Sequence, residues 1–76
     1  MRSTTAKTVL PFHDPDALVL PRELASFLKT TEAVLAQSRF RGVGIPYVRY
    51  GRRILYRIRD IRDYLDANTV PTRGGD

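Results

Sequence analysis

Arginines dominate the middle of this chain, and their chemistry indicates what kind of partner the chain can bind. Seven arginines and no acidic residue occur from Arg39 to Arg59. The guanidinium group is planar and always charged, and its fork of N–H donors matches phosphate oxygens or the edge of a guanine. A run with one sign of charge therefore favours a surface that binds a polyanion. The alternative is a sheet edge kept soluble by charge, a task that acidic residues would serve equally well.

The spacing of these arginines predicts a β-hairpin with two different faces. Apolar and arginine side chains alternate on either side of Gly51, and a period of two is typical of strands. Gly51 supplies the backbone freedom of a tight turn, and Arg52 would stand at its tip. One alternation continued through the whole segment predicts a packed face of Val48, Tyr50, Ile54 and Tyr56 and an outer face of Arg49, Arg53, Leu55 and Arg57.

Length and composition narrow the class of protein. The chain has 76 residues and a formal net charge of +5, and eleven of its thirteen basic residues are arginine. A chain of this size forms one small domain without a deep catalytic cleft, so nucleic acid is the first partner to consider. Cysteine is absent, which excludes disulfide and thiolate–metal frameworks.

No constellation of catalytic residues is visible in the sequence. There is no clustered pair of acids, no nucleophile with a base, and no glycine loop that could cradle a phosphate, so we expect no enzyme activity, no cofactor and no metal. No apolar run approaches the length of a membrane span or of a signal-peptide core. We therefore expect a cytoplasmic, nucleoid-associated protein without a membrane partner.

Two short helices are predicted before the hairpin. The first runs from Pro21 to about Lys29, because its apolar residues recur with helical spacing and proline suits the first helical position. The second runs from about Glu32 to Arg41, with Thr31 as its N-cap and an acidic residue at the positive end of the dipole. Helices joined so tightly form a helix-turn-helix.

The second helix is predicted to have a small, polar outward side. If Leu35 faces the core, the inward residues are Val34, Leu35 and Ser38, and the outward residues are Ala33, Ala36, Gln37 and Phe40. A DNA major groove admits such a helix, and glutamine can hydrogen-bond adenine through two atoms. An ordinary amphipathic surface helix fits this pattern equally well when it is taken alone.

The remaining segments complete one domain over residues 18–68. A third helix follows Arg57 and ends near Asn68, and its apolar stripe of Ile58, Ile61, Tyr64 and Leu65 is predicted to close the core. Residues 1–17 are predicted to form a flexible N-terminal arm, although Leu10 and Phe12 could lie against the domain. Residues 69–76 are predicted to form a disordered tail.

The resulting small α+β chain, in the order α-α-β-β-α, resembles the MerR-like winged helix-turn-helix of phage and plasmid excisionases, which are recombination directionality factors. The resemblance covers residues 20–66, and the Gly-Arg-Arg tip of the wing is its most specific part. It rests on Leu20–Ala25, Phe27 and Leu28 in the first helix, Thr31 and Leu35 in the second, Arg41–Gly44 in the loop, Pro46–Arg53, Tyr56 and Arg57 in the wing, and Asp60–Leu65 in the last helix.

The resemblance implies a division of labour on DNA. The second helix would enter the major groove, and the wing would lie over phosphates or in the adjacent minor groove. Bases would face Ala33 and Gln37, the DNA backbone would contact Thr31 and Arg41, and the wing tip would be formed by Arg52 and Arg53. With Glu32 and Arg49 beside them, the predicted DNA-binding residues are Thr31, Glu32, Ala33, Gln37, Arg41, Arg49, Arg52 and Arg53.

This chain departs from the family at two places. Relatives usually carry Trp at the position of Ser38, so Phe40 or Tyr47 is expected to fill the space between the second helix and the wing. Outward positions that are often arginine in the family are Ala33 and Ala36 here. Modest sequence selectivity is therefore expected.

The function implied by the resemblance is that of an architectural protein. Such a protein binds and bends attachment-site DNA and thereby directs an integrase toward excision. The expected partners are double-stranded DNA, an integrase or other recombinase, and further copies of the chain on DNA, the last because Leu55 would lie outward among arginines. Relatives with this fold also act as transcriptional regulators, which is the alternative function. A third alternative is a protein-interaction module whose basic face docks an acidic partner.

Overall fold

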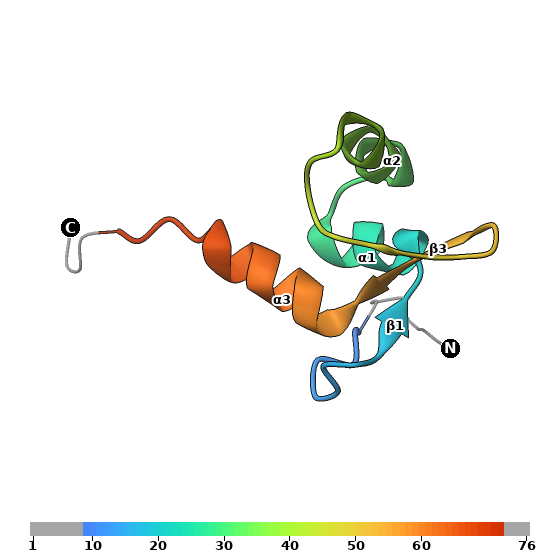
Figure 1. Ribbon diagram of the computed structural model, residues 1–76. Coiled ribbons are helices and arrows are strands. Elements are labelled where there is room, and N and C mark those ends of the chain that lie inside the picture. Colours follow the sequence, from blue (N-terminus) through green and yellow to red (C-terminus); the bar gives the residue numbers. More distant parts are fainter. Residues whose placement is uncertain (1–8, 73–76) are drawn as a thin grey trace, which may run out of the picture.

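The computed structural model describes residues 9–72. The elements, in chain order, are β1 (Leu18–Val19), α1 (Pro21–Leu28), α2 (Glu32–Arg41), β2 (Val48–Tyr50), β3 (Arg53–Arg57) and α3 (Ile58–Ala67). The β2–β3 hairpin projects to one side of the helices and α3 extends toward the other (Figure 1). The fold is small α+β, as predicted, but the predicted order is only roughly matched because a strand precedes α1.

The strand β1 is the element that the sequence did not predict. It pairs antiparallel with β3, so that Leu18 lies opposite Arg57 and Val19 lies opposite Tyr56. The sheet has the order β1-β3-β2, which makes β3 its central strand. Two residues are too few to show an alternation, and only the pairing with β3 defines them as a strand.

Local signals in the sequence set the ends of the first two helices. Pro21 begins α1, and Lys29 ends it with a φ of 60°, a left-handed conformation that is uncommon outside glycine. Thr31 caps α2 as predicted, since its Oγ1 accepts a hydrogen bond of 3.1 Å from the N–H of Val34. Gly42 ends α2 with a φ of 74°. Only residues 29–31 separate the two helices, which gives the tight junction that the sequence predicted.

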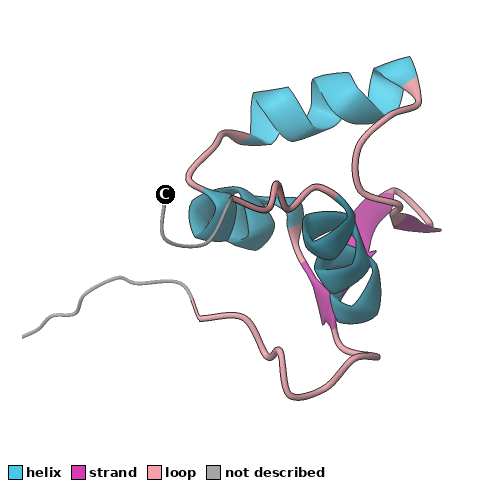
Figure 2. Ribbon diagram, turned by 90° about the vertical axis from the view of Figure 1, so that its left-hand side faces the viewer, coloured by secondary structure: helices cyan, strands magenta, loops and turns pink. Residues whose placement is uncertain are grey.

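The core lies where the three helices meet the central strand β3. Figure 2 shows α2 lying across the top of the molecule, with α1 and α3 beneath it. The stripe of α3 is directed into the core as predicted, and Ile58 and Ile61 are fully buried. The buried residues are Leu10, Val19, Leu24, Ala25, Leu35, Ile45, Tyr56, Ile58 and Ile61.

The segment before β1 packs on the domain. Leu10 is buried in the core, and the ring of Phe12 lies against that of Phe27 with the centroids 4.9 Å apart. Burial of two large apolar side chains is favourable, so the packing begins ahead of residue 18, which was the predicted start of the folded domain. Residues 1–8 of the predicted arm and 73–76 of the predicted tail lie outside the described residues.

The two faces of the hairpin differ from the prediction. The register pairs Val48 with Leu55, Arg49 with Ile54 and Tyr50 with Arg53. Residues directly opposite one another share a face of the sheet. The outer face therefore holds Leu18, Val48, Tyr50, Arg53, Leu55 and Arg57. The inner face, which is directed toward the helices, holds Val19, Arg49, Ile54 and Tyr56.

The turn explains why the predicted faces were wrong. Gly51 has a φ of 61° and Arg52 has no positive φ, the combination of a two-residue type II′ turn. Such a turn sets residue 50 opposite residue 53, so an even-numbered position faces an odd-numbered one. The alternation consequently changes phase at the turn. Arginine occurs on both faces, and the outer face is a mixture of arginine and apolar residues.

Candidate nucleic-acid interface

The helix α2 exposes one complete side to solvent. Its buried residue is Leu35, and the exposed residues opposite it are Ala33, Ala36, Gln37 and Phe40. Phe40 is 91% exposed although it is the aromatic residue of this helix. The predicted outward side is thus confirmed, but the prediction for Val34 is wrong, because this residue is 49% exposed. A helix held by so little apolar contact leaves most of its surface free for a partner.

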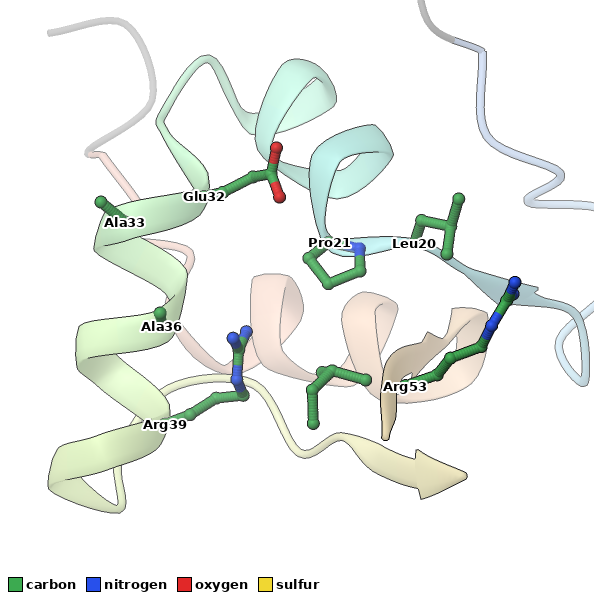
Figure 3. Close-up of a pocket in the computed structure, with 8 residues that line it drawn as sticks. Leu20, Pro21, Glu32, Ala33, Ala36, Arg39 and Arg53 are labelled. Carbon is green, nitrogen blue, oxygen red and sulfur yellow. The ribbon is translucent and has the colours of Figure 1, made fainter. Parts of the chain in front are cut away.

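A hollow of about 440 Å³ lies between α2 and β3. Its walls come from α2, from the start of β3 and from the N-terminal end of α1, and Figure 3 shows the side chains that border it. They are Leu20, Pro21, Glu32, Ala33, Ala36, Arg39, Arg53 and Ile54. Three predicted DNA-binding residues, Glu32, Ala33 and Arg53, therefore border one surface shared by the second helix and the hairpin.

Arg39 is the residue of this hollow that the sequence did not single out. Its Nη1 donates a hydrogen bond of 2.7 Å to the hydroxyl oxygen of Tyr56. Its guanidinium carbon also lies 5.8 Å from the ring centre of Tyr47 and 5.9 Å from that of Tyr56, within the range of a cation–π contact. The side chain extends from α2 toward the hollow (Figure 3). No carboxylate within residues 9–72 forms an ion pair with it.

The position of Arg39 in the helix explains why it was missed. It lies one turn after Leu35, on the side predicted to face inward, where an arginine needs a partner that the helix alone does not provide. The partners come from Tyr47 and Tyr56, after the end of α2. A useful signal would have been the coincidence of an inward arginine with two tyrosines in the following hairpin segment.

The space beside Ser38, where the resemblance led us to expect a compensating aromatic residue, is only partly filled. Phe40 is directed to solvent, whereas the ring of Tyr47 lies 6.4 Å from that of Tyr56. Tyr47 is thus the aromatic residue that packs between α2 and the hairpin. A second hollow of about 230 Å³ remains, with Ser38 and Tyr64 in its lining.

The other predicted residues surround the first hollow without converging on one point. Arg41 is exposed at the end of α2, and Arg52 is exposed at the hairpin turn. Arg49 is exposed on the inner face of the sheet, opposite to the predicted face. Thr31 uses its hydroxyl oxygen to cap α2. This spread suits an extended anion better than a small one.

The ion pairs of the described residues do not involve the arginines of α2 or of the hairpin turn. Within residues 9–72, ion pairs join Arg57 to Asp60 at 3.8 Å and Arg59 to Asp16. Both pairs lie near the junction of β3 with α3. The arginines of α2 and of the hairpin turn have no such partner in the described part of the chain, so the positive potential is concentrated there.

The part of the chain that the structure describes shows neither a metal site nor a membrane-spanning helix. It contains no group of three or more His, Cys, Asp or Glu side chains that could hold a metal ion. None of its helices is both long enough and apolar enough to cross a bilayer.

Comparisons with known proteins do not assign this chain to a family. No family model, curated protein or solved structure matches it.

Proposed function

We propose that this chain is a winged helix-turn-helix protein that binds double-stranded DNA, with α2 in the major groove and the β2–β3 hairpin as the wing. The observation that carries the proposal is the hollow shared by α2 and β3, which unpaired arginines border. Small side chains on α2 allow its backbone to approach base edges closely. Arginines on the hairpin supply phosphate contacts, which position a protein on DNA without specifying sequence.

The charges around the hollow support a path for the sugar–phosphate backbone. Arg39 and Arg53 border opposite sides of it (Figure 3). The N-terminal end of α1 at Pro21 adds the positive end of a helix dipole, which the carboxylate of Glu23 in the first turn partly offsets. A DNA strand that passes between helix and wing would meet both guanidinium groups. We therefore add Arg39 to the predicted DNA-binding residues.

Tyr56 prepares Arg39 for this contact. Its buried hydroxyl holds the guanidinium before DNA arrives, so less side-chain entropy is lost when a phosphate binds. Glu32 has a different role, because a carboxylate repels phosphate but can accept a hydrogen bond from the amino group of cytosine.

The biological role that we propose is that of a recombination directionality factor. The protein would bind and bend attachment-site DNA and direct a recombinase toward excision, a role inferred from the resemblance to excisionases. An excision assay with an integrase whose gene is found beside the gene of this chain tests it, because excision that depends on this chain is the expected result. Repression of an overlapping promoter without any effect on excision would instead identify a transcriptional regulator.

DNA binding itself is tested by the salt dependence of affinity. Contacts to about four to six phosphates predict that log K falls with log salt at a slope of about −4 to −5. Replacing Arg52 and Arg53 together by Ala should weaken binding to all sequences alike and reduce the slope by about 2. The measurement is a fluorescence-anisotropy titration of duplex DNA at several salt concentrations.

A charge-matched control separates the effect of the wing arginines from the effect of a lower net charge. The Arg59→Ala/Arg62→Ala variant removes the same charge from α3, and its one ion pair is exposed and contributes little to stability. It should leave the slope nearly unchanged. Absence of binding to any duplex at low salt would favour the protein-interaction alternative, and a flat salt dependence would exclude the electrostatic account.

A further inference from the structure

The outward side of α2 is mostly apolar, and the core does not explain this. Ala33, Ala36 and Phe40 present only carbon, and Gln37 is the one polar residue among them. A single exposed apolar residue is ordinary on a protein surface. Here three lie on one side of a helix, with Glu32 and Arg41 on its flanks. Arg39 and Arg53 border a hollow together with two alanines of the stripe, so positive charge exceeds negative charge beside it. Such a surface favours a partner that is a polyanion and also offers apolar groups.

The stripe has the dimensions of a short stretch of duplex. Ala33 and Phe40 are seven residues apart, which is about 10 Å along a helix axis. Base pairs follow one another at about 3.4 Å, so the stripe spans about three of them. The alanines allow the middle of α2 to lie close to the base edges, and Phe40 extends further from its C-terminal end.

Only one base offers a methyl group in the major groove. Thymine presents its 5-methyl group there, whereas the edges of guanine, cytosine and adenine present donors and acceptors. An apolar side chain placed against such a polar edge would leave it without a hydrogen bond, which is unfavourable once water is excluded. Gln37 has the two-atom pattern that fits adenine.

We propose that α2 recognises thymine through its 5-methyl group, with Ala33, Ala36 and Phe40 as the apolar contacts and Gln37 on a neighbouring adenine. The inference rests on the proposed DNA binding and names the bases that α2 distinguishes. The preferred site should contain consecutive A·T pairs where α2 lies in the major groove. Specificity would then depend on shape and methyl contacts rather than on the arginine–guanine pairs common in major-groove recognition.

Replacing thymine by uracil tests the inference directly. A duplex is first recovered with the full chain by binding selection from a random-sequence library, and its thymines are then replaced one at a time by deoxyuridine. This removes a methyl group and keeps the base pair. Loss of one buried methyl contact should weaken binding about threefold to fourfold at positions under α2 and leave binding unchanged elsewhere.

Two variants assign the effect to α2. Phe40→Ser should remove the preference for thymine over uracil at one position. Gln37→Ala should reduce the preference for adenine in the same way. Val70→Ser is the matched control, because Val70 is 82% exposed and follows the end of α3. It should leave every preference unchanged.

The outcomes separate the two proposals. No binding to any duplex would overturn DNA binding and this inference together. Binding with equal affinity for thymine and uracil duplexes, or selected sites without A·T pairs, would overturn the inference alone. The inference alone is also overturned if Phe40→Ser keeps the preference for the thymine methyl group but abolishes a contact with another protein. The stripe would then be a protein-binding surface.

Discussion

Two helices of ten residues each, α2 and α3, relate sequence to burial in opposite ways. The apolar residues of α3 face the core, where Ile58 and Ile61 are fully buried, and its charged residues face solvent. In α2 only Leu35 is buried, while Phe40 and Val34 are exposed. Folding accounts for the residue pattern of α3. It does not account for that of α2, whose exposed side is better explained by a partner.

The comparison also separates two uses of arginine. Near α3, Arg57 and Arg59 form ion pairs with aspartates of the same chain. In α2, Arg39 is held by two tyrosine rings and forms no ion pair within residues 9–72. A guanidinium held by neutral groups keeps its full charge for an anion, whereas one paired with a carboxylate is largely neutralised.

The largest expected effect is on stability, and it contrasts the two helices. Ile61→Ala should lower the free energy of unfolding by about 2 to 5 kcal/mol, because it leaves a cavity in the core. Phe40→Ala should change it by no more than about 0.5 kcal/mol, because the ring is in solvent. Urea unfolding followed by circular dichroism measures both. A Phe40→Ala variant as unstable as Ile61→Ala would place Phe40 in the core and remove the contrast between the helices.

The helices could be predicted from the sequence because their signals are local. Thr31 caps α2 through a residue three positions away, and the stripe of α3 is visible within ten residues. The arrangement of the sheet depends on pairing, which local patterns do not contain. The two-residue turn at Gly51 exchanged the faces of β2, and β1 exists only because β3 lies beside it.

The candidate site was predictable to the same extent. Helix periodicity and the turn predict that Ala33, Gln37 and Arg52 are exposed, and the structure confirms this exposure. The role proposed for Arg39 depends on Tyr56, which lies seventeen residues later and meets it only in the folded chain. Contacts of this kind need the tertiary structure, because no spacing within α2 indicates them.

A smaller effect tests how Arg39 is positioned. Tyr56→Phe removes the hydroxyl that accepts from Arg39 and keeps the buried ring, so stability should fall by about 0.5 to 1.5 kcal/mol. DNA affinity should fall by about 1 kcal/mol, or about fivefold, because the freed guanidinium must be ordered on binding. Anisotropy titrations of the folded variant at low temperature measure the second effect.

Tyr64→Phe is the matched control for this prediction. Tyr64 is a half-buried residue of α3 that lines the hollow at Ser38, as Arg39 and Tyr56 also do, but not the hollow between α2 and β3. Its hydroxyl is not the acceptor of the Arg39 hydrogen bond, which goes to Tyr56. Its variant should keep the affinity of the unmodified chain. If Tyr56→Phe binds as tightly as Tyr64→Phe while Arg39→Ala binds more weakly, Arg39 contacts DNA without being positioned by the tyrosine.

The contrast between α2 and α3 recurs in the two faces of the sheet. The inner face buries Tyr56 against the helices, whereas the outer face carries a hollow of about 370 Å³ whose lining residues all come from the three strands. Its lining is Leu18, Val48, Tyr50, Arg53 and Leu55. Leu55 therefore lies outward as predicted, although among apolar residues as well as arginines. The apolar part of the outer face is larger than the sequence indicated. This supports the prediction of a contact between copies of the chain on DNA.

The smallest expected effect concerns this contact. Copies bound at adjacent sites meet at a high effective concentration, so an interface worth about 1 kcal/mol gives about fivefold cooperativity without dimers in free solution. Leu55→Ser should remove this cooperativity and preserve the affinity for a single site, because Leu55 does not border the hollow between α2 and β3. Titrations of duplexes with one, two and three sites measure both quantities, with Val70→Ser as the control. Equal affinity per site on all three duplexes of the unmodified chain, or cooperativity that survives Leu55→Ser, would show that the outer face does not join neighbouring copies.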